Sequence, residues 1–176
     1  MLKKIPLVLV ALVVLFVDVV ALQPSDYRVE RSVTIAAPAS TVFPNVNDFH
    51  KCQAWSPWAK LDPDAKIAFA GPEAGEGTIM KWNGDDKVGE GKMTLVESKP
   101  DEAVKIKVEF TRPFEGGTNS DFGFSPKGEE TEVVWAMHGT HNFMEKAFCL
   151  VMDGLGMMGN DIDKRLSQLK SVVEQG

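Results

Sequence analysis

The chain of 176 residues is poor in the side chains from which metal sites and nucleophilic centres are built. Its two cysteines, Cys52 and Cys149, are too few for a disulfide framework or a cysteine-based zinc site. The histidines are His50, His138 and His141; the last two lie three apart, a spacing that turns them to opposite faces of a strand. A His50–Cys52 pair would activate a thiol, although two ordinary structural residues are the alternative. We therefore predict no metal and no cofactor.

Familiar catalytic signatures are also missing. The sequence has no Gly-x-Ser-x-Gly, no P-loop, no His-Glu-x-x-His and no dinucleotide fingerprint at a strand–helix junction. An aspartate inside a pocket would serve as a general base, and Asp153, Asp161 and Asp163 are candidates on a C-terminal helix. A solvated helix face is the alternative interpretation, so no catalytic residue is assigned.

Positive charge is in the minority. Lysine and arginine number 19 against 25 aspartates and glutamates, which gives a net charge of −6. This balance argues against general nucleic-acid binding, which needs a basic surface. The hydrophobic fraction of 44% is ordinary for a folded domain and excludes a disordered chain.

One long apolar run opens the chain. Residues 5–22 are apolar apart from one proline and one aspartate, and as a helix they would span about 27 Å, close to a bilayer core. The two lysines before this run favour an orientation that exports the rest of the chain. We predict a single-pass anchor in the inner membrane, with a domain of residues 23–176 facing the periplasm. A signal peptide cleaved after Val19–Ala21, releasing the domain, is the alternative.

Residues 23–176 are predicted to form an α+β domain. Apolar and polar residues alternate over 27–35, and helical spacing follows until Pro44, which should kink or split the helix. Six further strands are predicted near 66–69, 78–82, 89–97, 104–110, 119–125 and 131–139. One apolar stripe then marks a long helix over 142–173, capped by Asn142 with Glu145. Glycines at 154, 156 and 159 indicate either a bend with a close approach or a break into two helices.

Several blocks of the sequence resemble one superfamily. The blocks 29–38, 46–50 and 55–63, the last containing Trp-Ser-Pro-Trp, look like the SRPBCC (START/Bet v 1-like) superfamily, in its polyketide cyclase/dehydrase-like, membrane-anchored bacterial branch. The resemblance implies a helix-grip fold, in which a seven-stranded antiparallel sheet wraps around a long C-terminal helix and encloses a hydrophobic cavity. Its members bind apolar molecules, and a minority are enzymes. Cys52, which stands where the family pattern has Trp, and Pro44 depart from that pattern.

Aromatic and methionine side chains supply the candidate binding site. Four Trp, ten Phe and eight Met suit an apolar, adaptable cavity, while a plain core is the alternative for each of them. The predicted lining consists of Trp82, Met93, Phe110, Phe124, Trp135, Met137, Met144, Phe148 and Met152. Trp55 and Trp58 should brace the wall, and Arg112 would meet an anionic headgroup unless it is only an exposed turn residue.

These features predict a membrane-tethered carrier or sensor that binds a hydrophobic small molecule or lipid. One alternative is a polyketide cyclase/dehydrase-like enzyme that uses His138, turned into the same cavity by a bulge. Another alternative is a protein-interaction, chaperone-assisting domain. An exposed apolar patch outside the cavity would be evidence for it. The sequence names no protein partner.

Overall fold

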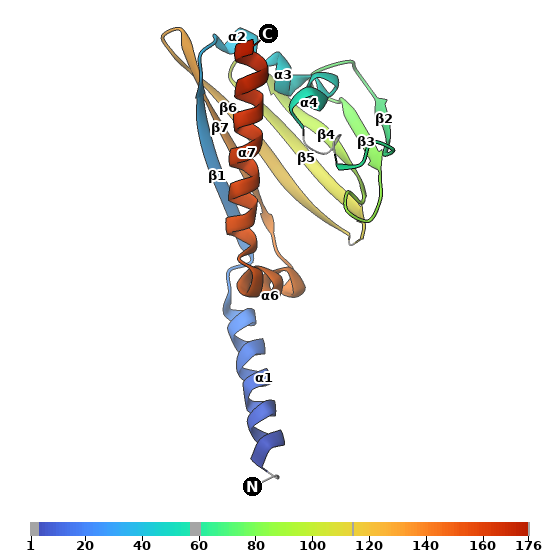
Figure 1. The fold of residues 1–176 in the computed structure, drawn as a ribbon, viewed down its shortest axis with the longest axis vertical. Coiled ribbons are helices and arrows are strands. Elements are labelled where there is room, and N and C mark those ends of the chain that lie inside the picture. Colours follow the sequence, from blue (N-terminus) through green and yellow to red (C-terminus); the bar gives the residue numbers. More distant parts are fainter. Residues whose placement is uncertain (1–3, 57–60, 114, 176) are drawn as a thin grey trace.

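The computed structural model describes residues 4–56, 61–113 and 115–175. An N-terminal helix, α1 (Lys4–Leu22), leads into an α+β domain, shown in Figure 1. Among the described residues, helices α2 (Ala39–Val42), α3 (Pro44–Asn47) and α4 (Phe49–Trp55) follow the first strand, and α6 (Phe143–Met152) and α7 (Gly154–Gln175) come after the last strand. The strands are β1 (Asp26–Ile35), β2 (Lys66–Ala70), β3 (Ile79–Asn83), β4 (Glu90–Lys99), β5 (Ala103–Arg112), β6 (Gly116–Lys127) and β7 (Glu130–Thr140).

The strands form one antiparallel sheet in the order β1-β7-β6-β5-β4-β3-β2. Strands β2 to β7 are neighbours in sequence order, whereas β1 pairs with β7, so that Asp26 lies opposite Thr140. A register shift between Leu95 and Glu97 marks a bulge in β4, a feature that bends a strand and increases its twist. The predicted seven-stranded sheet is confirmed.

Pro44 divides the first helical region, as predicted. Helix α2 (Ala39–Val42) ends before it, α3 (Pro44–Asn47) begins with it, and α4 (Phe49–Trp55) follows. Proline lacks the backbone N–H that a continuous helix needs but is accommodated in a first turn. The Asp48 side chain then accepts a hydrogen bond from the His50 N–H at 2.8 Å and caps α4.

The C-terminal region forms two helices, α6 (Phe143–Met152) and α7 (Gly154–Gln175). The predicted capping box of Asn142 and Glu145 starts α6. Asp153, with φ 50° and ψ 48°, ends α6 in a left-handed conformation that interrupts the helix. The single apolar stripe predicted for 142–173 is therefore wrong, because its first turns belong to a separate helix that leaves the axis of α7.

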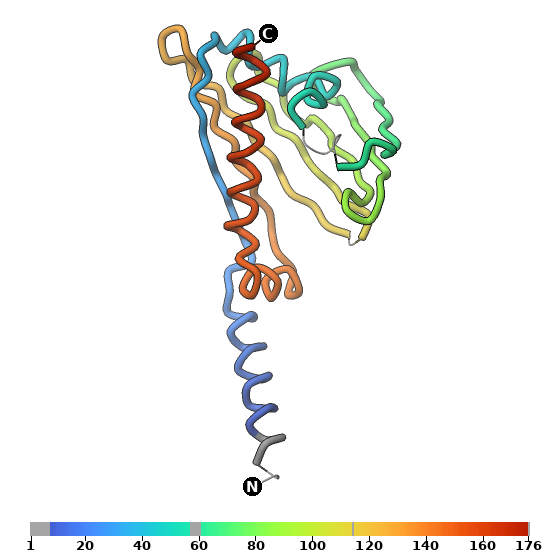
Figure 2. The backbone as a smooth tube through the Cα atoms, in the orientation of Figure 1, coloured from blue at the N-terminus to red at the C-terminus, as the bar shows by residue number. Residues whose placement is uncertain are grey.

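Helix α7 lies across one face of the sheet, beside β1 (Figure 2). Ile162, Leu166 and Leu169 are buried against that face. At Gly159 the helix approaches the Arg31 guanidinium so closely that a Cβ would collide with it. Both interpretations of the helix glycines therefore apply in part: the helix breaks at Asp153, and Gly159 allows a close contact.

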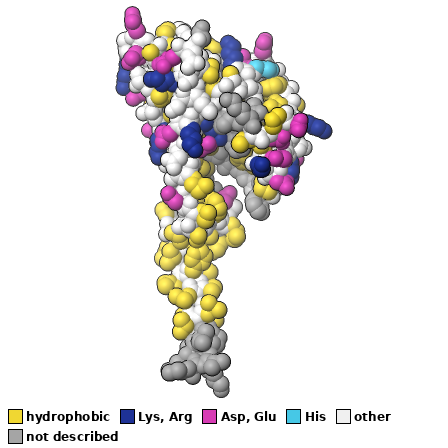
Figure 3. All heavy atoms as spheres, viewed as in Figure 1, with side chains coloured by type: hydrophobic (Ala, Val, Ile, Leu, Met, Phe, Trp, Pro, Cys, Tyr) yellow, Lys and Arg dark blue, Asp and Glu magenta, His cyan; other side chains and the backbone are white. Residues whose placement is uncertain are grey.

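Among the residues described, no helix is both long enough and apolar enough to cross a membrane. The described side chains of α1 are nevertheless mostly apolar and exposed: Val8 is 58% and Leu22 is 84% exposed, whereas Val20 is buried. Figure 3 shows these side chains as a hydrophobic surface that continues over the neighbouring α6 region.

Candidate functional site

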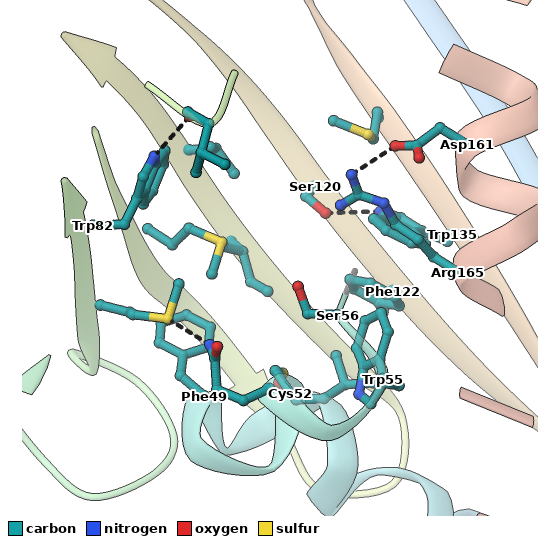
Figure 4. A pocket seen from close by; sticks show the side chains of 18 of the residues that line it. Phe49, Cys52, Trp55, Ser56, Trp82, Ser120, Phe122, Trp135, Asp161 and Arg165 are labelled. Carbon is teal, nitrogen blue, oxygen red and sulfur yellow. Dashed lines mark hydrogen bonds and ion pairs between the residues drawn. The ribbon is translucent and has the colours of Figure 1, made fainter. Parts of the chain in front are cut away.

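A cavity of about 410 Å³ lies between the sheet, α4 and α7 (Figure 4). Its wall is mainly apolar, with side chains contributed by β3, β4, β5, β6 and β7 as well as by the two helices. Such a volume is in the range of small-molecule sites, which are typically apolar with a few polar groups. The arrangement can therefore enclose an apolar ligand.

Trp82 forms the wall at the β3 side of the cavity. Its indole meets the Phe110 ring edge-on at a centroid distance of 5.6 Å and donates its N–H to the Val88 carbonyl oxygen at 3.3 Å. Gly91 lies between the two aromatic residues across the sheet, and a Cβ there would meet the indole at 2.5 Å. The glycine thus makes the space in which Trp82 lies flat over β4.

A second aromatic group closes the α4 side of the cavity. Trp55 packs edge-on against Trp135 and Phe122, at centroid distances of 6.1 and 6.4 Å. Phe122 and Trp135 stack on each other at 4.7 Å, and the Trp55 indole donates to the Asn45 carbonyl oxygen at 2.9 Å. Trp55 therefore both braces and lines the wall, whereas Trp58 lies outside the described residues.

Polar groups gather on the α7 side of the cavity. An Nη atom of Arg165 lies 2.6 Å from a carboxylate oxygen of Asp161, one helical turn earlier. The guanidinium carbon lies 5.9 Å from the centre of the Trp135 ring, whose N–H donates to the Ser120 hydroxyl at 2.8 Å. Burial lowers the pKa of the Arg165 guanidinium, and the Asp161 carboxylate opposes that shift. The polar residues of this side thus form one connected group around Trp135.

The His50–Cys52 pair, weighed above against two ordinary structural residues, does not form. Cys52 is buried at the cavity wall, and its thiol donates to the carbonyl oxygens of Asn45 and Val46 at 3.3 and 3.4 Å. Burial raises the pKa of this thiol well above its ordinary value, which keeps it protonated and unreactive. His50 instead stacks on Phe69 at 3.9 Å. Cys52 and Cys149 are both free thiols.

Five of the nine predicted lining residues lie around the cavity: Trp82, Met93, Phe110, Trp135 and Met137. Their contact with a ligand stays a prediction. The other four are placed elsewhere, which corrects the expected lining. Phe124 is buried in the core against the edge of Phe43, while Met144, Phe148 and Met152 lie exposed on α6. The α6 residues miss the cavity because the break at Asp153 separates α6 from α7.

Two further predicted site residues do not line the cavity. The partner of Met137, Ser120, lies on the cavity face of β6, so His138 points to the opposite face of the sheet. There the His138 imidazole lies 2.9 Å from the Asp121 carboxylate, and no bulge turns it inward as expected for the enzyme alternative. Arg112 bonds to the Gly84 carbonyl and, at 3.2 Å, to the Asn83 side chain, so it ties β5 to the β3–β4 loop.

Two features of the site were not expected from the sequence, the pairing of Arg165 with Asp161 and the presence of Ser120. A helical signal for the pair was present, because Met158, Asp161 and Arg165 recur at the spacing of one helix face. All three line the cavity. For Ser120 the only signal was its alternation with Phe122 along the strand.

A seven-stranded antiparallel sheet that holds a C-terminal helix and an apolar cavity defines a helix-grip protein of the Bet v 1-like type. The chain belongs to the polyketide cyclase/dehydrase and lipid transport family, whose sequence profile matches residues 26–174, and so to the SRPBCC superfamily. No curated protein matches the chain.

Solved structures share the fold at low sequence identity. Protein MLL2253 from Mesorhizobium loti has a TM-score of 0.63 at 12% identity, covering 85% of this chain and 98% of its own. The Aha1 dimer from Colwellia psychrerythraea has a TM-score of 0.60 at 14% identity, with coverages of 84% and 96%. A protein from Nitrosospira multiformis has a TM-score of 0.59 at 18% identity, with coverages of 82% and 94%. These similarities show that the chain shares the fold of these proteins.

Proposed function

We propose that the protein binds a hydrophobic small molecule or lipid in the cavity between the sheet and α7, and acts as a carrier or sensor held at a membrane. The observation that carries the proposal is the cavity itself, about 410 Å³ of space lined mainly by apolar and aromatic side chains. Protein interiors are ordinarily packed to crystal-like density, so a core needed only for stability would fill this space. The lipid-transport description of the family supports the same function.

Native mass spectrometry of the full chain, extracted gently from membranes, tests this proposal. We expect a discrete added mass that is released on unfolding. Met93→Trp, which fills the cavity from β4, should lose that mass, whereas Val96→Trp should keep it, because Val96 lies on the same strand and is 46% exposed. A bare protein mass before and after exposure to a lipid extract would refute ligand binding.

We also propose that residues 5–22 tether the protein to the inner membrane, with the domain facing the periplasm, as in the membrane-anchored branch of the superfamily. The apolar run in the sequence and the exposed apolar side chains of α1 support this assignment. A carrier of molecules that partition into lipid gains from being held at their source. The intact mass of the membrane-extracted chain should include residues 1–22; a chain beginning near residue 22 would establish the cleaved alternative.

Helix α6 extends the apolar surface of α1. It exposes Phe143, Met144, Phe148, Leu150, Val151 and Met152. The Lys146 ammonium donates to the carbonyl oxygens of Ala21 and Gln23 at 3.3 and 3.1 Å, which holds α6 beside the end of α1. We propose that α6 lies in the bilayer interface, where short apolar helices bind through their exposed side chains. A protein partner on the same surface is the alternative.

A spin label can show whether lipid or a protein partner covers α6. The label is placed at Met144→Cys in a Cys149→Ser chain, leaving only the buried Cys52 thiol, and the full chain is reconstituted into phosphatidylcholine–phosphatidylglycerol vesicles. High accessibility to oxygen and low accessibility to a polar nickel chelate would support a lipid surface. Low accessibility to both would indicate a protein partner, and high accessibility to the chelate would indicate water. A label at Val96→Cys provides the exposed control.

A further inference from the structure

The charged side chains of the cavity wall are concentrated at one end. In Figure 4, Trp82 and Phe49 lie away from α7, while Ser120, Trp135, Asp161 and Arg165 lie together beside it. The remaining wall is mainly apolar; its polar side chains are Ser56 and Gln53, and the Gln53 amide already donates to the Met80 sulfur at 3.0 Å. A ligand that matches this wall has one polar group at an end of an otherwise apolar body, because an unpaired polar group elsewhere would lose hydrogen bonds to water.

The charge at the polar end is already balanced. Only 14% of the Arg165 side chain is exposed, and its guanidinium is paired with the Asp161 carboxylate at 2.6 Å. The guanidinium also lies within cation–π range of Trp135. The pair is therefore an ionic but nearly neutral group, and Asp161, with 51% of its side chain exposed, is its more accessible member.

This balance distinguishes between neutral and anionic ligands. A carboxylate or phosphate at this end would meet the Asp161 carboxylate and leave a net negative charge in an apolar cavity, which is costly. A hydroxyl group can accept a hydrogen bond from a guanidinium N–H and donate one to the carboxylate. A carbonyl group can accept from the guanidinium without adding charge.

We infer that the cavity selects a neutral amphiphile, with its apolar body toward Trp82 and a hydroxyl or carbonyl end at the Arg165–Asp161 pair, over a fatty acid or other anion. This inference rests on the proposed binding function and specifies the class of its ligand. In this arrangement Asp161 determines the specificity, because it decides whether the guanidinium charge is available to an anion.

The test is a competition between 1-dodecanol and laurate, which share a chain length and differ at the polar end. The full chain is mixed with both at equal concentration and pH 8, and native mass spectrometry gives the ratio of the two bound masses. The wild-type chain should bind dodecanol at least about tenfold better than laurate. Asp161→Asn leaves the guanidinium charge without its carboxylate and should reverse the preference.

Asp163→Asn is the matched control. It removes the same charge from the same helix, but Asp163 pairs with Arg31 at 3.2 Å and does not line the cavity. Its binding ratio should equal that of the wild type. If Asp161→Asn fails to fold, Arg165→Gln provides the second variant: it should bind dodecanol more weakly and laurate more weakly still.

The outcomes test the binding function and the assigned polar end of the cavity separately. Binding of neither ligand, together with a bare mass from membranes, would overturn the binding function itself. Wild-type preference for laurate, or a ratio that Asp161→Asn leaves unchanged, would overturn the assigned polar end while leaving hydrophobic binding intact. A reversal in Asp161→Asn that is absent from Asp163→Asn would establish the inference.

Discussion

Asp153, the left-handed residue between α6 and α7, provides a test of the helix break, because the break decides which of two variants is more stable. At φ 50° and ψ 48°, Asp153 adopts a conformation that costs an L-residue roughly 1–2 kcal/mol. Glycine pays no such cost, although it loses about 0.5–1 kcal/mol of stability through backbone entropy relative to alanine. Asp153→Gly should therefore be more stable than Asp153→Ala by about 0.5–1 kcal/mol.

Comparing these two variants with each other cancels the loss of the Asp153 side-chain hydrogen bond. Both lose the hydrogen bond that the Asp153 carboxylate accepts from the Gly156 N–H at 3.3 Å, so this loss cancels. Inside a continuous helix the order would be reversed, with alanine more stable than glycine by about 1 kcal/mol. Urea unfolding of the full chain in one detergent, followed by tryptophan fluorescence, can resolve this difference.

A position inside α7 provides the internal standard. Asn160 is exposed in the helix, so Asn160→Ala should be more stable than Asn160→Gly by about 1 kcal/mol. If alanine is also preferred at position 153, residues 142–173 form one helix and the assigned break is wrong. Opposite rankings at the two positions are the expected result.

Three further predictions concern other parts of the fold. Ellman's reagent should titrate Cys149 promptly and Cys52 only after unfolding. The reason is that burial raises the pKa of the Cys52 thiol and blocks access to it. Two thiols that both react fast would contradict that burial. Gly91→Ala should lower the free energy of unfolding by about 1–3 kcal/mol in urea titrations, because the added methyl group collides with the Glu109 carbonyl oxygen and with the Trp82 indole. An unchanged midpoint would show free space at this position. Lys105, which hydrogen-bonds Glu97, and Lys99, which forms an ion pair with it, lower the folded-state pKa of Glu97. The stabilisation from Glu97 is therefore present above the unfolded-state value of about 4.3 and is lost as pH falls through the folded value. Glu97→Gln should flatten the acid slope of stability, and parallel slopes for the two proteins would refute the pairing.

The sheet was largely predictable because its signal is local. Val104, Ile106 and Val108 alternate with charged residues in the sequence, and all three are buried in β5. The same period identified the cavity-facing Trp135 and Met137 in β7. Where successive side chains simply alternate between two faces, the sequence determines which of them point inward.

The site could be predicted only in part, because its geometry depends on long-range packing. Met144 and Phe148 have the same spacing as the core residues of α7, and one left-handed residue between the two helices removes them from the cavity. Nothing in the sequence indicates that Arg165 is buried, since a charged side chain at helical spacing is usually solvated. Its burial follows from the position of Trp135, which is distant in sequence and adjacent in space.

The pairing of β1 with β7 has a consequence for how the domain folds. Ile35 pairs with Thr131, so the first strand leaves the ribosome nearly a hundred residues before its partner. At synthesis rates of about 5–20 residues per second, that interval is on the order of 5–20 s. Because α7 packs mainly against β1, the last helix must also wait for this pairing. The two ends of the domain therefore come together in a late folding step of high contact order.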